Sequence, residues 1–160
     1  MRNYKNSIYA LACLSFTMII GAGVFEHLVL WPKAYEAMPK SLTMFQGDYA
    51  LNPGNFWMLI HPITLLLFTV NLIVFWKTSR RKTIAIVFGS YFIILVITNL
   101  YFVPELMDLT GTPMADSVDP ALVARGKLWM NLSLIRICTL IILAILLYLG
   151  LTKPIDKQNT

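Results

Sequence analysis

Charged residues are scarce in this chain, and so are cysteines. Of the 160 residues, 13% are charged and 58% are hydrophobic, whereas a soluble domain carries about 25% charged and about 45–50% apolar residues. This shortage of charge excludes an ordinary water-soluble enzyme, and the high apolar content excludes a disordered chain. The two cysteines, Cys13 and Cys138, lie in apolar runs at different depths. They form no disulfide framework and are typical of small packing residues.

The charge that is present is mostly positive, with a net charge of +5. A nucleic-acid-binding protein gathers its basic residues in a stripe on one folded face. Here the basic residues stand in short segments between apolar runs. The predicted partner is therefore a lipid bilayer, and no nucleic acid is expected.

Four long apolar runs divide the chain. Each is close to the length of about 20 residues that a spanning helix requires, and none alternates as a β-barrel strand does. We predict an all-α protein, an integral membrane four-helix antiparallel bundle in a single domain of residues 1–160. The predicted spans are residues 7–30, 56–76, 83–103 and 120–151. Asp119-Pro120 is typical of an N-cap followed by proline, so the fourth helix should begin near Pro120 and be the longest.

Lysine and arginine are distributed unequally between the two ends of these spans. Eight lie in the N-terminal segment, in the connection of residues 77–82 and in the C-terminal tail, against four in the two opposite loops. The positive-inside rule then places both termini in the cytoplasm. We expect a multi-pass protein of the bacterial inner membrane.

The first and third spans finish in a similar way. Leu28-Val29-Leu30-Trp31-Pro32 and Leu100-Tyr101-Phe102-Val103-Pro104 both close on proline, and an acidic residue follows each. Two related hairpins would explain this, and so would the ordinary use of proline to end a helix. We favour the second interpretation.

Ionisable side chains inside spans are costly and mark functional sites by default. Glu26 and His27 lie just inside the outer end of the first span, and His61 lies at a matching depth in the second. Arg136 is about eight residues into the fourth span, at about 1.5 Å of depth per residue. All four fall in the extracytoplasmic half of the predicted bundle and are the candidate catalytic residues.

An arginine at this depth calls for a partner. Glu26 is the one acid inside a predicted span, and Glu105 lies just past the third. Arg136 should therefore point into the bundle and pair with one of them, Glu26 first; such a pair is either structural or functional. The residues predicted to contact a substrate are Trp129, Asn131, Tyr101, Asn99 and Glu105.

The two histidines also suggest a cofactor. His27 and His61 on neighbouring spans are placed to ligate haem iron, or to join Glu26 in a metal site of two histidines and one carboxylate. No HExxH, CxxCH or paired Glu-x-x-His motif supports either. The cofactor is therefore left open between none and a haem or metal held by His27 and His61.

Short motifs resemble those of the anthrone-oxygenase-like family of small four-helix membrane proteins. The segments that carry the resemblance are residues 21–25 with Trp31-Pro32, Asn55-Phe56-Trp57, residues 101–104, and residues 127–136 with Trp129, Asn131 and Arg136. The resemblance implies a four-helix bundle and, in some members, oxidation of a phenolic anthrone by oxygen without metal or flavin. The site residues that the resemblance carries over to this chain are Trp129, Asn131 and Arg136.

Several functions remain open at this point. The first is binding or oxidation of a small aromatic or quinone-like molecule entering from lipid, with Arg136 stabilising an oxyanion and His27 or His61 removing a proton. This would be a cofactor-independent, oxygenase-like oxidoreductase. The others are a haem- or metal-binding protein, a non-enzymatic small subunit or assembly factor, and a carrier that works as a homo-oligomer.

Overall fold

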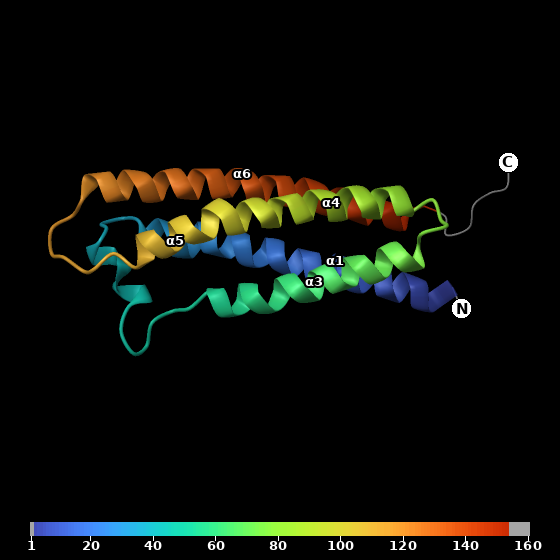
Figure 1. Ribbon diagram of the computed structural model, residues 1–160, viewed down its shortest axis with the longest axis horizontal. Coiled ribbons are helices and arrows are strands. Elements are labelled where there is room, and N and C mark those ends of the chain that lie inside the picture. The colour runs from blue at the N-terminus through green and yellow to red at the C-terminus, as the bar shows by residue number, and fades with distance from the viewer. Residues whose placement is uncertain (1, 154–160) are drawn as a thin grey trace.

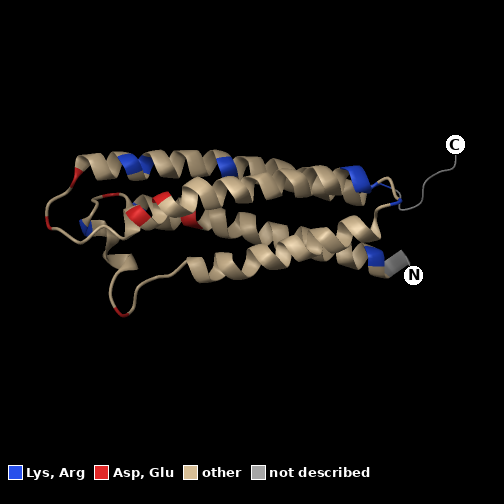
Figure 2. Cartoon of the chain, in the orientation of Figure 1, with Lys and Arg blue, Asp and Glu red and all other residues tan. Residues whose placement is uncertain are grey.

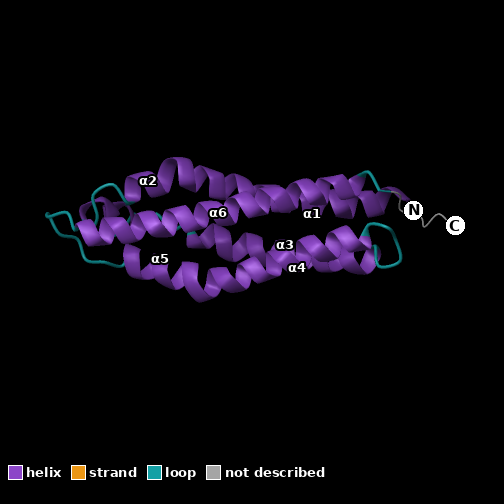
Figure 3. Cartoon of the chain, turned by 90° about the horizontal axis from the view of Figure 1, so that it is seen from above, coloured by secondary structure: helices purple, strands orange, loops and turns teal. Residues whose placement is uncertain are grey.

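Four long helices run antiparallel along one axis in the computed structural model, which describes residues 2–153 (Figure 1). They are α1 (Arg2–Phe25), α3 (Gly54–Val74), α4 (Arg81–Ile97) and α6 (Pro120–Leu151). α1 packs against α3 and α6, and α4 packs against the same two helices. The described residues contain helices and loops without a strand (Figure 3). The predicted all-α four-helix bundle is confirmed.

All four helices are long and apolar enough to span a membrane. The apolar helical stretches are Tyr4–Ala34, Gly54–Val74, Arg81–Thr110 and Pro120–Leu151. α1 begins and α6 ends at the same end of the bundle (Figure 1), which we call the termini end. The opposite end carries the loops of residues 35–53 and 111–119 and is called the loop end.

The first and third helices continue past the prolines that were expected to end them. α1 passes through a π turn, η1 (Glu26–Leu30), into α2 (Trp31–Ala34), and α4 passes through a π turn, η3 (Thr98–Phe102), into α5 (Val103–Thr110). In each turn, the residue just before the proline donates a backbone hydrogen bond to the carbonyl five residues earlier, Trp31 to Glu26 and Val103 to Thr98. A π turn lets the helix absorb the proline, whose missing N–H breaks the regular α-helical pattern. The interpretation of these prolines as helix ends is therefore wrong.

The fourth helix begins where the sequence indicates. Asp119 has extended backbone angles, and its carboxylate accepts hydrogen bonds from the backbone N–H groups of Ala121 and Leu122 at 2.8 and 3.3 Å. This is the geometry of an N-cap. With 32 residues α6 is the longest helix, as predicted.

The loop end is closed by an aromatic cluster rather than left as bare helix ends. The segment after α2, including the 3₁₀ helix η2 (Lys40–Phe45), folds back over α6. The buried residues of this cluster are Trp31, Ala34, Tyr35, Met38, Leu42, Phe102, Leu109 and Trp129. The Trp31 and Trp129 rings meet edge to face at 5.1 Å between centroids. This cluster forms one wall of the region where the sequence places the polar residues.

The termini end is held by Arg80, which the positive-inside rule counts only as one of the basic residues that set the topology. Arg80, in the short α3–α4 connection, is 4% exposed. Its guanidinium donates to Asn6 Oδ1 at 2.9 Å, to the Leu151 carbonyl at 2.8 Å and to the Lys153 carbonyl at 2.9 Å. One side chain thus joins the start of α1, the α3–α4 connection and the end of α6, and we call this set of contacts the Arg80 clamp.

Close packing at the same end gives a first prediction. A Cβ atom on Gly150 would collide with the Tyr9 hydroxyl and lie 3.2 Å from Thr83 Cγ2, and Tyr9 donates to the Leu147 carbonyl at 2.6 Å. Gly150→Ala should lower the free energy of unfolding by about 1–3 kcal/mol, the usual range for overpacking. Gly89→Ala is the matched control, because a Cβ there meets nothing within 4 Å. Equal unfolding midpoints for the two variants in detergent would contradict this packing.

Candidate functional site in the loop-end half of the bundle

Arg136 is held inside the bundle by neutral groups. It projects from α6, and its guanidinium donates to Thr98 Oγ1 in the π turn η3 at 2.9 Å and to Ser133 Oγ at 2.8 Å. The guanidinium carbon also lies 4.4 Å from the centroid of the Phe102 ring. Hydroxyl groups and an aromatic face orient a guanidinium without neutralising its charge. Arg136 therefore keeps a positive charge that no carboxylate contacts.

The expected ion pair between Arg136 and Glu26 is not formed. Both residues are described, and no nitrogen–oxygen contact between them is as short as 4.0 Å. Instead, Glu26 Oε1 accepts a hydrogen bond from Trp57 Nε1 of α3 at 2.9 Å. The prediction of a direct pair failed because Ser133, one turn away on the same helix, and Thr98 supply hydrogen bonds that were not counted.

Although it is not paired, Arg136 is close enough to exert a Coulombic effect on Glu26, His27 and His61, and this effect is smaller than that of their burial. The four candidate catalytic residues come from three elements, Glu26 and His27 from η1, His61 from α3 and Arg136 from α6, and lie in the loop-end half of the bundle.

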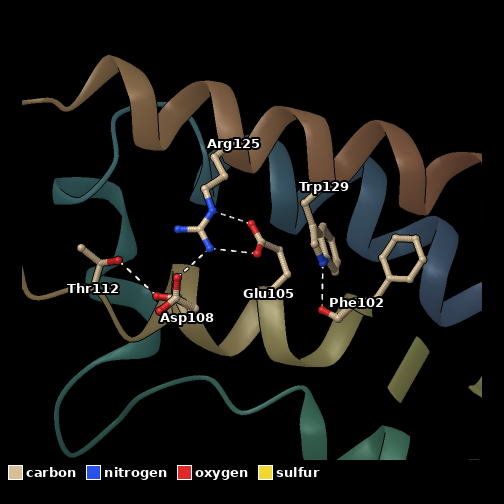
Figure 4. Close-up of polar contacts among 6 residues, drawn as sticks. All are labelled: Phe102, Glu105, Asp108, Thr112, Arg125 and Trp129. Carbon is tan, nitrogen blue, oxygen red and sulfur yellow. Dashed lines mark hydrogen bonds and ion pairs between the residues drawn. The ribbon is translucent and has the colours of Figure 1, made fainter. Parts of the chain in front are cut away.

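Glu105, the second acid expected near Arg136, belongs to a different arrangement. It receives two hydrogen bonds from Arg125 at 2.6 and 2.8 Å, and Arg125 also contacts Asp108 at 2.6 Å (Figure 4). This bidentate pair links α5 to the first turns of α6. Glu105 is therefore paired with Arg125 at the loop end and does not serve as the partner of Arg136.

The hydrogen bond of His27 fixes the proton on its ring. Nδ1 lies 2.8 Å from the Gly23 carbonyl, and because a carbonyl only accepts, Nδ1 must carry the proton. In the neutral ring Nε2 is then left with a lone pair, the arrangement of a base. Gly23 also allows α1 to approach α6 closely, because a Cβ atom there would lie 3.1 Å from Ile137 Cδ1.

His61 sits in a hydrogen-bonded and stacked network on α3. Its Nδ1 lies 2.7 Å from the Tyr91 hydroxyl, and its ring stacks on Trp57 at 5.3 Å between centroids. Trp57 in turn binds Glu26, so the two candidate residues are connected through one indole. Among the described residues, no group of three or more His, Cys, Asp and Glu side chains is arranged to hold a metal ion. Haem ligation by His27 and His61 stays a prediction.

Three buried polar atoms in this region make no well-formed hydrogen bond with a described residue: His27 Nε2, Trp31 Nε1 and the Tyr35 hydroxyl. The Trp31 side chain lies near the Glu26 carboxylate and the backbone of Met130 lies near His27, without the geometry of a full hydrogen bond. Trp31 is 2% exposed and Tyr35 is 1% exposed. Burial raises the pKa of Tyr35, and the nearby carboxylates of Glu26 and Glu105 raise it further, so Tyr35 stays a neutral phenol. Since buried polar atoms are nearly always paired, this group indicates a place for water or for the polar atoms of a ligand.

A groove leads from the side of the bundle to Glu26. It has a volume of about 320 Å³. Its walls come from α1 and η1 on one side, with Ala22 and Phe25, and from the entrance to α3 on the other, with Pro53 and Phe56. Glu26 is the charged group that lines it. Apart from Glu26 and Asn52, the groove is lined by apolar residues of the helices and of the loop before α3.

The remaining sequence-predicted residues divide into one that is buried and three that face outward. Trp129 is 3% exposed, and its Nε1 donates to the Phe102 carbonyl at 2.9 Å (Figure 4). Asn99, Tyr101 and Asn131 are exposed, and Asn99 donates to the Leu95 carbonyl of its own helix. Trp31 and Tyr35 were not among the predicted site residues. Their spacing of four and eight residues after His27, which places all three along one helix face, was the signal in the sequence.

No family profile, no curated protein and no solved structure matches this chain.

Proposed function

We propose that the loop-end site binds a small aromatic, quinone-like or phenolic molecule from the lipid phase and oxidises it. The observation that carries this proposal is the charge of Arg136, which is held by two hydroxyls and an aromatic ring and contacts no carboxylate. A preorganised cation in a site shielded from water stabilises an oxyanion that develops there. The mostly apolar groove at Glu26 supplies a route for an apolar molecule.

The proposed chemistry uses two groups of the site, the proton-accepting Nε2 of His27 and the positive charge of Arg136. Nε2 of His27 accepts a proton from the substrate, and the electron pair left behind moves onto the substrate oxygen as a phenolate or enolate near Arg136. For an anthrone, one molecule and one O₂ then give one anthraquinone and one water, with oxygen as the electron acceptor. The resemblance to the anthrone-oxygenase-like family in the stretch around Trp129, Asn131 and Arg136 supports this class of substrate.

Purified protein in detergent, supplied with anthrone in air, tests the proposal by oxygen uptake and by anthraquinone absorbance. We expect saturable turnover above the protein-free rate and a fall of about 10²- to 10⁴-fold in His27→Gln, the range for a general base. Thr139→Ala should keep the full rate, because Thr139 is exposed and bonds only within α6. If anthrone reacts no faster with the wild-type protein than without protein, the proposed oxidation is contradicted and the role of a non-enzymatic subunit is favoured.

We also propose that both termini lie in the cytoplasm of a bacterium, with the loop end outside. The support is the excess of lysine and arginine at the termini end. Cysteines introduced at Ser79 and at Thr112 distinguish the two orientations. A membrane-impermeant maleimide added to intact cells should label the second position and not the first, and the reverse pattern would overturn the orientation.

A further inference from the structure

The termini end of the bundle is basic throughout its described part. Its cationic residues with described side chains are Lys5, Lys77, Arg80, Arg81, Lys82 and Lys153, and no Asp or Glu lies there among the residues that the structure describes (Figure 2). The described acids all lie at or near the loop end. Because no carboxylate among the described residues is near, these cations are left to water, to neutral acceptors or to an anion from outside the described part of the chain.

Internal acceptors satisfy some of these cations and leave others free. Arg80 is used by the Arg80 clamp, and Lys153 donates to Thr83 Oγ1 at 2.7 Å. The Arg81 guanidinium lies over the Trp76 ring, 5.1 Å from its centroid. Lys5 of α1 and Lys77 of the α3–α4 connection have no hydrogen bond or ion pair with any described residue.

These two free lysines line the same groove. It has a volume of about 500 Å³ and lies between the start of α1 and the end of α3, with Ile73, Val74, Trp76 and Thr78 as its other walls. Ile73 is 70% exposed and Trp76 is 54% exposed. The groove therefore combines an apolar wall, which continues along the lipid-facing side of α3, with two ammonium groups at the level where that helix ends.

We propose that this groove binds one anionic phospholipid, with its phosphate between Lys5 and Lys77 and an acyl chain against Ile73 and Trp76. The charge pattern selects an anion, since the described lining of the groove has two cations without a described partner and no acid. The apolar wall selects a lipid over a free anion, and tryptophan is one of the aromatic residues that favour the headgroup level. The site is separate from the loop-end site and stands whether or not that site is catalytic.

Titration of the detergent-solubilised protein with phosphatidylglycerol tests the proposal, with the shift of the unfolding midpoint as readout. We expect phosphatidylglycerol to stabilise the protein more than phosphatidylcholine does. The double variant Lys5→Gln/Lys77→Gln should lose about 30-fold in apparent affinity, which corresponds to roughly 1 kcal/mol for each basic residue at an anionic surface. Lys77→Gln alone should lose about 5-fold on the same basis and serves if the double variant is unstable.

The matched control is Lys40→Gln/Lys127→Gln, which removes the same charge from two exposed lysines at the loop end. It should bind phosphatidylglycerol as the wild type does. Equal losses in the two double variants would overturn the proposal, because they would show a response to net charge alone. Equal stabilisation by phosphatidylcholine, or by inorganic phosphate without lipid, would overturn the assignment of an anionic phospholipid.

Discussion

Arg80→Leu is expected to lower the free energy of unfolding by about 3–5 kcal/mol, more than any other single substitution considered for this chain. The variant loses three hydrogen bonds from a charged donor, each worth about 1.5–3 kcal/mol and not fully additive. It also leaves the Leu151 and Lys153 carbonyls and Asn6 Oδ1 without the group that satisfies them. Contacts of the guanidinium with the Tyr9 and Phe75 rings, at 5.4 and 5.5 Å, are lost as well.

Unfolding of the purified protein in mixed detergent micelles measures this effect. Arg81→Leu is the control, since Arg81 is the next residue, carries the same charge and is exposed. It should change the unfolding midpoint far less. Arg80→Lys should fall between the two, because one ammonium group cannot reach all three acceptors of a planar guanidinium. An Arg80→Leu variant as stable as Arg81→Leu would show that the Arg80 clamp does not hold the bundle.

Arg136→Gln is expected to reduce the turnover of anthrone by about 10²- to 10³-fold, the usual effect of removing one oxyanion-stabilising donor. The amide of glutamine can still bond to Ser133 or Thr98, so the fold should persist. The loss should fall on kcat more than on KM, because the oxyanion develops only during the reaction. Arg136→Lys should recover part of the rate, since it restores a charge without the planar geometry.

Arg125→Gln is the control for charge at the same face of α6. It removes a cation that already binds Glu105 and Asp108 at the loop end, and it should leave kcat unchanged. If Arg136→Gln keeps the wild-type rate, or loses rate only in proportion to a loss of folded protein, Arg136 has a structural role alone.

The number of helices, their apolar character and the start of α6 at Pro120 could be predicted, because hydropathy and capping depend on neighbouring residues. Depth along a helix was predictable for the same reason, so Glu26, His27, His61 and Arg136 were correctly assigned to one half of the bundle. Depth does not specify which face a residue occupies. Asn99 was predicted to contact a substrate, yet its side chain is exposed and donates its hydrogen bond to the Leu95 carbonyl of the same helix.

The partners of the charged residues could not be predicted from the sequence. The π turns at Glu26–Leu30 and Thr98–Phe102 change the angular position of the residues that follow them, and Thr98 reaches Arg136 from one of these turns. Arg80 was counted with its neighbours as a topological charge because the positive-inside rule treats every basic residue in a short connection alike. Its buried role depends on residues far away in the chain.

The Arg80 clamp has a consequence for the order in which the protein is made. A ribosome synthesises Arg80 when, of the four long helices, only α1 and α3 have been completed, and two of its three acceptors, Leu151 and Lys153, lie at and just after the end of the last helix. Until that helix is made, Asn6 is the one acceptor of the Arg80 clamp that has been synthesised. The Arg80 clamp is therefore complete only after the fourth helix has been inserted, which makes its last two contacts a late step of biogenesis.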